Sequence, residues 1–292
     1  MRYAYHASMC PPEQYIPLAQ ALEIAGFDAF AMPDSICYPE VSDSQYPYNK
    51  DGDREFLDSV PFIHPFIVIP AMAAVTRKIR FNTFVYKLGV HQPVHVAKQI
   101  QSLAIMTNNR FDFGVGISPW PEDFAITSTP WEGRGKRLDE IIDIIGGLET
   151  GKYFEFEGEH FKIQSVKMCP APTEHVPILI GGHAEPALRR AAVRSDGWMC
   201  AGANMAELDG YIRRINELRE EAGTAEKPFQ FHTTGGDAFS LEGIEQLENI
   251  GVTEVIIGFR NVYECEPDNK SLEEKIDQIN WYSETIIKPS RA

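Results

Sequence analysis

The stretch with the clearest capacity to bind a ligand is Val176–Ala192, which reads VPILIGGHAEPALRRAA. Its first five residues form a short apolar run, and the pair Gly181–Gly182 that follows is a turn signal. Glu185 and Pro186 suit the first turn of a helix that begins at once. Glycines let backbone N–H groups approach a ligand, and the positive end of a helix favours an anion. The pattern predicts an anion site, although an ordinary strand-to-helix turn has the same residues.

Other kinds of chemistry lack their usual patterns in this chain. We find no HExxH or GxSxG motif, no paired catalytic carboxylates and no metal-ligand spacing of His, Asp and Glu. The five cysteines are odd in number, scattered and without a CxxC pair. They indicate reduced thiols, so we expect a cytoplasmic protein with no zinc site and no disulfide framework.

Composition excludes several classes of partner. The 292 residues carry a net charge of −15, which argues against a nucleic-acid surface. No apolar stretch reaches the ~18 residues of a membrane span, and the N-terminus does not resemble a signal peptide. We therefore expect a single globular domain over residues 1–292 with no membrane partner.

Strands and helices alternate along the whole chain, which is the pattern of a (β/α)8 barrel, also called a TIM barrel. A doubly wound sheet is the alternative, but it does not ordinarily need so many units. The predicted strands are Arg2–His6, Asp28–Pro33, Ile79–Tyr86, Arg110–Val115, Val176–Ile180, Trp198–Ala201, Phe229–Thr234 and Glu254–Phe259. The predicted helices are Ala19–Ala25, Pro65–Val75, Pro93–Thr107, Arg137–Leu148, a helix from Glu185, Met205–Ala222, Leu241–Asn249 and Leu272–Ile287.

Three segments interrupt this alternation. Cys37–Pro61 is long and polar, and its aromatic residues Tyr38, Tyr46, Tyr48 and Phe56 predict a lid over a flat ligand. Gly116–Trp131 is predicted as a second functional loop. Tyr153–Ile163 alternates and turns at Glu157–Gly158, so we expect a β-hairpin there.

In such a barrel the active site lies on the loops that follow the strands. Those loops combine an anion site, several glycines and aromatic side chains, which favours a bound organic cofactor. The relevant segments are His6, Asp34–Ser35, Thr83–Tyr86, Gly116–Glu122, Gly181–His183, Ala201–Gly202 and Thr233–Thr234. His6, at the end of the first strand, is a candidate proton donor. Arg189, Arg190 and the run Arg134 to Arg137 are expected on the surface.

The chain resembles the bacterial-luciferase-like barrels, and within them the branch of oxidoreductases that use the deazaflavin F420. The resemblance is carried in order by AGFDAFAMPDS, YPYNKDG, NTFVYKLGVHQPVHVAKQIQSL, NNRFDFGVGISPWPEDF, RGKRLDEIIDII, VPILIGGHAEPALRRAA and SDGWM. It implies an isoalloxazine-like ring in the barrel mouth, with its phosphate on the turn Gly181–His183. It also implies a non-prolyl cis peptide behind the ring, which alignment puts at Thr83–Phe84.

The resemblance and the positions of residues on the loops together assign roles. The predicted cofactor-binding residues are Asp34, Thr83, Phe84, Gly116, Ser118, Glu122, Gly181, Gly182, His183 and Ala201. The predicted catalytic residues are His6, Asp34 and Glu122. The predicted substrate-binding residues are Ser35, Tyr86 and Trp120, and no metal is expected. Two departures matter, because F420-dependent sugar-phosphate dehydrogenases of the family have histidine and glutamate where this chain has Ser35 and Pro119.

These observations lead us to expect hydride transfer between F420 and a small enone, ketone, quinone or alcohol. Sugar-phosphate oxidation is not predicted. One alternative is an FMN-dependent luciferase-like monooxygenase, and another is a cofactor-binding barrel with little catalysis. We also expect a homodimer.

Overall fold

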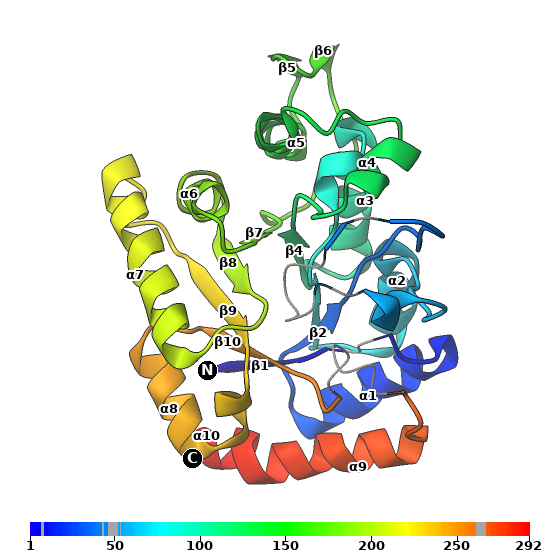
Figure 1. Ribbon diagram of the computed structural model, residues 1–292, viewed down its shortest axis with the longest axis vertical. Helices are drawn as coiled ribbons and strands as arrows, with labels where there is room; N and C mark the ends of the chain where they lie inside the picture. Colours follow the sequence, from blue (N-terminus) through cyan, green and yellow to red (C-terminus); the bar gives the residue numbers. More distant parts are fainter. Residues whose placement is uncertain (7–8, 43, 46–51, 53, 261–266) are drawn as a thin grey trace.

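The computed structural model describes residues 1–6, 9–42, 44–45, 52, 54–260 and 267–292. At its centre is a closed parallel barrel whose strands follow the spatial order β1-β10-β9-β8-β7-β4-β3-β2 (Figure 1). The barrel strands are β1 Arg2–His6, β2 Ala29–Met32, β3 Arg80–Thr83, β4 Phe111–Val115, β7 Ile178–Gly181, β8 Gly197–Cys200, β9 Gln230–Thr234 and β10 Glu254–Ile257. The predicted fold class is confirmed.

Helices cover the outside of this barrel. They are α1 Tyr15–Ala25, α2 Pro65–Val75, α3 Pro93–Met106, α4 Pro121–Ile126, α5 Arg134–Glu149, α6 Glu185–Arg194, α7 Met205–Ala222, α8 Leu241–Asn249, α9 Leu272–Tyr282 and α10 Lys288–Ser290. Local signals set several of their ends. Helix α1 stops at Gly26, whose φ of 88° is left-handed, and α7 begins with a capping box between Asn204 and Glu207. None of the helices described here is both long and apolar enough to cross a membrane.

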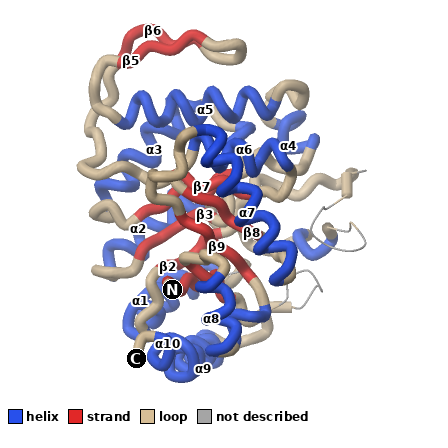
Figure 2. Tube along the Cα trace, turned by 90° about the vertical axis from the view of Figure 1, so that its left-hand side faces the viewer, coloured by secondary structure: helices blue, strands red, loops and turns tan. Residues whose placement is uncertain are grey.

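The predicted hairpin is present as β5 Phe154–Glu157 and β6 Lys162–Val166, which pair antiparallel. It projects beyond α5, away from the barrel (Figure 2). The predicted loop Gly116–Trp131 is wrong in part, because α4 lies within it. Proline at the first helical position, followed by Glu122 and Asp123, is a helix-start signal that the sequence prediction missed.

The end of the barrel at which the strands begin contains buried charged side chains. Glu254 is fully buried and pairs with Arg2 at 2.9 Å and with His232 at 3.1 Å. Arg80 and Asp112 form a second pair at 2.6 Å. Polar groups at this end of such a barrel serve stability, so the opposite end is left for function.

Two of the arginines predicted at the surface are buried, so that prediction is wrong for them. Arg137 donates to the carbonyl oxygens of Gly89 and His91, and only 8% of it is exposed. Arg190 is also 8% exposed and donates from Nε to Asp139 at 2.5 Å. In both cases a helix turns a long side chain inward, where carbonyl or carboxylate oxygens accept its hydrogen bonds.

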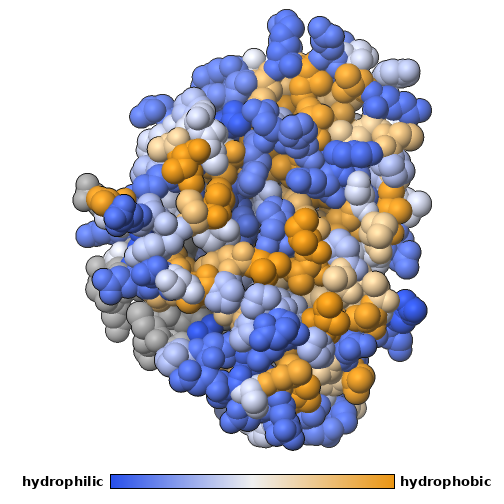
Figure 3. All heavy atoms as spheres, turned by 90° about the vertical axis from the view of Figure 1, so that its right-hand side faces the viewer, coloured by the Kyte–Doolittle hydropathy of each residue, from blue (hydrophilic) through white to orange (hydrophobic). Residues whose placement is uncertain are grey.

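Viewed from the side of α2 and α3, hydrophobic side chains are scattered among hydrophilic ones (Figure 3).

Candidate active site

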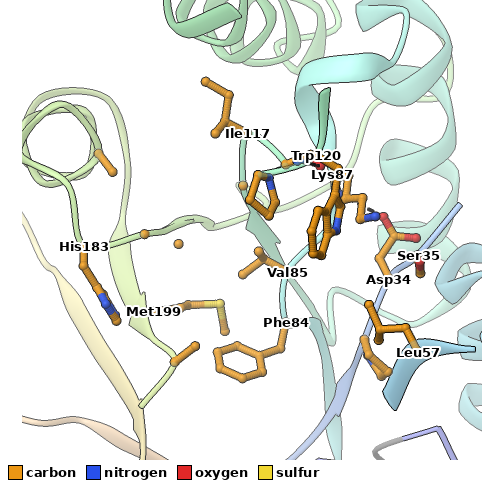
Figure 4. A pocket seen from close by; sticks show the side chains of 18 of the residues that line it. Asp34, Ser35, Leu57, Phe84, Val85, Lys87, Ile117, Trp120, His183 and Met199 are labelled. Carbon is orange, nitrogen blue, oxygen red and sulfur yellow. Dashed lines mark hydrogen bonds between the residues drawn. The ribbon is translucent and has the colours of Figure 1, made fainter. Parts of the chain in front are cut away.

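A cavity of about 500 Å³ opens where the barrel strands end. Residues following β1, β2, β3, β4, β7 and β8 all contribute to its wall, as predicted for this fold. The predicted site residues that line it are His6, Asp34, Ser35, Phe84, Gly116, Ser118, Trp120, Gly181, Gly182, His183 and Ala201. Figure 4 shows Val85 near the centre, His183 at one end, and Asp34 and Lys87 at the other.

Val85 forms the wall behind this space, held between two glycines. A Cβ on Gly116 would lie 2.8 Å from Val85 Cγ2, and a Cβ on Gly181 would lie 3.0 Å from Val85 Cγ1. Both positions must therefore be glycine for Val85 to keep its place. The non-prolyl cis peptide is Phe84–Val85, so its prediction at Thr83–Phe84 is wrong by one residue. The reason is that the ladder continues further than expected: Thr83 pairs with Met32, and the Phe84 N–H still donates to the Met32 carbonyl at 2.8 Å.

One end of the cavity is suited to an anion. Gly182, His183, Ala184 and Ala187 line it where α6 begins, and α6 has no side-chain cap at its N-terminus. First-turn N–H groups without a capping side chain are ready donors to an anion. The Arg190 guanidinium lies one turn further on, in the same wall. The ring of His183 stacks on Tyr211 at 5.0 Å, and its Nε2 lies 3.3 Å from the Cys200 thiol.

The other end carries a compact group of polar side chains. Asp34 Oδ2 accepts the backbone N–H of Lys87 at 2.9 Å, and burial raises the pKa of this carboxyl group. Lys87 Nζ pairs with Asp123 at 2.7 Å, and Asp123 also accepts from Ser118 Oγ at 2.6 Å. An acid with a raised pKa beside a buried ammonium group is an arrangement typical of sites that move protons.

His6 also lines the cavity, edge-on to the Phe84 ring at 5.5 Å. Burial, with a smaller contribution from Arg260, lowers the pKa of His6 to about 4. The imidazole is therefore neutral at pH 7, and any proton that it donates comes from a neutral ring.

Three predicted site residues do not contact the cavity. Thr83 is fully buried and its hydroxyl donates to the Gly114 carbonyl at 2.6 Å. Tyr86 lies in the core, where its ring stacks on Phe66 at 4.8 Å and on His91 at 4.6 Å. Glu122 lies in a neighbouring hollow, where it accepts from the hydroxyls of Ser42 and Ser44.

The predicted lid is described only in part. Phe56 and Leu57, in the short 3-10 helix Glu55–Leu57, line the cavity, and Tyr38 lies outside it. Tyr46 and Tyr48 are outside the described residues. Other wall residues were not predicted: Met9, Pro33, Phe62, Lys87, Arg190 and Met199. Lys87 was within reach of sequence reasoning, since it comes one residue after the selected segment Thr83–Tyr86.

The sequence model described as luciferase-like monooxygenase matches residues 3–238. The chain belongs to the luciferase-like monooxygenase family. This luciferase-like protein is 50% identical to Uncharacterized protein Rv0940c of Mycobacterium tuberculosis, over 98% of this chain and 99% of that protein. It is 26% identical to the F420-dependent glucose-6-phosphate dehydrogenase of Nakamurella multipartita, over 76% of this chain and 63% of that protein.

Two solved structures of similar fold are named for different activities. Monooxygenase RslO1 from Streptomyces bottropensis matches this luciferase-like protein with a TM-score of 0.78, 16% identity and full coverage of both chains. An F420-dependent secondary alcohol dehydrogenase matches with a TM-score of 0.76, 16% identity and 98% coverage of both chains. At this identity the similarity shows the fold alone.

Proposed function

We propose that this luciferase-like protein is an oxidoreductase that transfers a hydride between the deazaflavin F420 and a small enone, ketone, quinone or alcohol. The names of the F420-dependent dehydrogenase relatives support the choice of cofactor. The observation that carries the proposal is the position of Val85 between Gly116 and Gly181, directly beside the uncapped start of α6. An apolar wall next to an anion site suits a ring that carries a phosphate.

The residues present fit such a group. Side chains at Gly116 or Gly181 would displace Val85, and Gly182 has a φ of 116°, which few residues other than glycine adopt. The turn Gly181–His183 and the start of α6 would hold the phosphate, with Arg190 contributing positive charge. Val85, Phe84 and Met199 would contact the ring. When bound, F420 supplies or accepts a hydride.

The protein's own contribution is to hold the substrate and handle one proton. Asp34 is placed for the proton, because burial raises its pKa and the Lys87 N–H fixes one of its oxygens. Phe56, Leu57, Phe62 and Trp120 line the cavity with apolar surface, which would limit water beside a bound substrate. Ser35 and Pro119 both line the cavity in place of the histidine and glutamate of the sugar-phosphate dehydrogenases, so oxidation of a sugar phosphate is not proposed.

Turnover tests this proposal. Purified protein with reduced F420 is offered enones, ketones and quinones, and with oxidised F420 it is offered alcohols, while the deazaflavin absorbance is followed. We expect turnover with at least one class, and we expect Asp34→Asn to lower kcat at least ~100-fold, the usual scale of a lost acid–base group. Turnover that requires reduced FMN and oxygen would contradict the proposal and favour the monooxygenase alternative. Saturable F420 binding without turnover would favour the binding-protein alternative.

Assembly and location are part of the same proposal. We propose a cytoplasmic homodimer; Ile24, Ile67 and Met106 are exposed apolar side chains on α1, α2 and α3. Light scattering at several concentrations measures the mass, and a monomer throughout would contradict the dimer.

A further inference from the structure

We propose that the substrate carries a carboxylate group, and that Arg54 binds this group in a side chamber next to the main cavity. The inference rests on the proposed function, since it adds a substrate class to the same site. Four observations carry it: the chamber, the burial of Arg54, a donor atom of Arg54 with no partner in the described part of the chain, and the contacts of the neighbouring carboxylates.

The side chamber has a volume of about 260 Å³. Its wall residues are Ser35, Cys37, Tyr38, Pro39, Arg54, Leu57, Trp120, Glu122, Asp123 and Ile126. Ser35, Leu57 and Trp120, which Figure 4 labels in the main cavity, line both spaces, so the two adjoin at these residues. The proposal requires the far end of a substrate in the main cavity to pass these shared side chains into the chamber.

Arg54 is the buried cation of this chamber, with only 7% of its surface exposed. Its guanidinium carbon lies 4.3 Å from the centre of the Trp120 ring and 5.8 Å from that of Tyr38. Nη1 is 3.6 Å from Glu122, too far for a good hydrogen bond. Nη2 is buried and has no hydrogen-bond partner among the residues that the structure describes. A buried, charged donor without an acceptor is unfavourable, so this atom indicates a missing acceptor.

The two carboxylates in the chamber wall obtain their hydrogen bonds from other residues. Glu122 accepts from Ser44 Oγ at 2.9 Å and from Ser42 Oγ, and these bonds help to lower its pKa. Asp123 pairs with Lys87 at 2.7 Å and accepts from Ser118. The charge of Arg54 also helps to lower the pKa of Glu122, but Arg54 Nη2 has no acceptor among the described residues.

These features select a particular kind of anion. A guanidinium group presents parallel N–H donors that match the two oxygens of a carboxylate. Leu57, Trp120 and Ile126 provide apolar contact for an organic body. A phosphate dianion would meet stronger repulsion from Glu122 and Asp123 than a carboxylate with a single charge. The geometry therefore favours an organic monoacid over a phosphate ester.

The test compares an acid with its uncharged analogue. Isothermal titration calorimetry measures the Kd of 3-phenylpropanoate and of 3-phenylpropanamide, with and without F420. We expect wild type to bind the acid at least tenfold more tightly than the amide. Arg54→Gln should bind both equally, with an unchanged Kd for the amide, and Glu122→Gln should bind the acid severalfold more tightly because a competing charge is removed. Equal binding by wild type, or an acid preference that survives in Arg54→Gln, would overturn the inference.

A matched control separates the chamber from arginine–tryptophan stacking in general. Arg134 lies 3.6 Å from the Trp131 ring and lines neither the cavity nor the chamber, so Arg134→Gln should keep the acid preference. If Arg54→Gln binds neither compound, the same titrations are made with Arg54→Lys. A reduced but remaining preference for the acid supports the inference, and equal binding of the acid and the amide overturns it. If the protein prefers the acid but does not bind F420, the proposed function is wrong and the carboxylate site at Arg54 stands. If it binds F420 but does not prefer the acid, the proposed function stands and the carboxylate site is wrong.

Discussion

Replacing Gly116 by alanine tests the position of Val85, which the proposed ring site requires. The new Cβ would lie 2.8 Å from Val85 Cγ2, closer than such contacts normally occur. Val85 must shift to relieve this contact, and it lines the cavity, which offers it space. Overpacking of this kind costs about 1–3 kcal/mol in the free energy of unfolding. Since Val85 is pushed into the cavity, we also expect the Kd for F420 to rise about tenfold, or about 1.4 kcal/mol.

The assay combines urea unfolding with fluorescence titration of F420 for a double-mutant cycle. Val85→Ala removes both methyl groups, so the cost of Gly116→Ala should fall by at least ~1 kcal/mol in that background. Gly146→Ala in α5 is the control, since nothing lies within 4 Å of its added Cβ, and stability should rise by roughly 0.5–1 kcal/mol. Unchanged stability and affinity in Gly116→Ala, or strict additivity with Val85→Ala, would refute the reasoning.

Three further predictions concern separate parts of the molecule. Asp196 and Glu149 raise the pKa of His175 to about 10, so its stabilising effect is complete below its ordinary pKa of 6.5 and is lost as the pH rises toward 10. The unfolding free energy of wild type minus that of His175→Gln should therefore shrink from pH 6 to pH 10, and a constant difference would contradict this. Lys87→Met leaves Asp123 buried without its cation and should cost about 3–5 kcal/mol by urea unfolding, with much of the loss recovered by adding Asp123→Asn. If the double variant recovers none of the lost unfolding free energy, the Lys87–Asp123 ion pair is not the cause of the loss. Gly182→Val should raise the Kd for F420 at least tenfold, about 1.4 kcal/mol in binding free energy, while its circular dichroism spectrum stays native. An unchanged Kd would show that this turn does not bind the phosphate.

Much of the fold could be predicted because its signals are local. Proline at the start of α2 and α3, glycine after α1, and β-branched or aromatic runs in the strands place most elements within a few residues. The barrel then follows from the alternation of strands and helices. From the barrel follows the set of loops that forms the cavity wall, which is why eleven predicted residues line it: His6, Asp34, Ser35, Phe84, Gly116, Ser118, Trp120, Gly181, Gly182, His183 and Ala201.

The remaining site residues depend on where a side chain points, which spacing does not reveal. Arg190 follows the anion turn by a full helical turn, and only the packing of α6 against α5 brings its guanidinium to Asp139 and the cavity. Tyr86 belongs to a segment that reaches the cavity, yet its own ring packs in the core against Phe66 and His91. Arg54 and Glu122 meet through a long-range contact between a polar segment and α4 that no local pattern encodes.

The central claim, that the cavity holds a deazaflavin by its phosphate, is tested most directly by binding. F420 and FMN are titrated side by side into the purified protein, and quenching of their fluorescence gives both dissociation constants. The account predicts a micromolar Kd for F420 and a Kd in the millimolar range for FMN, a difference of about 4 kcal/mol in binding free energy. Micromolar binding of FMN with millimolar binding of F420 would contradict it.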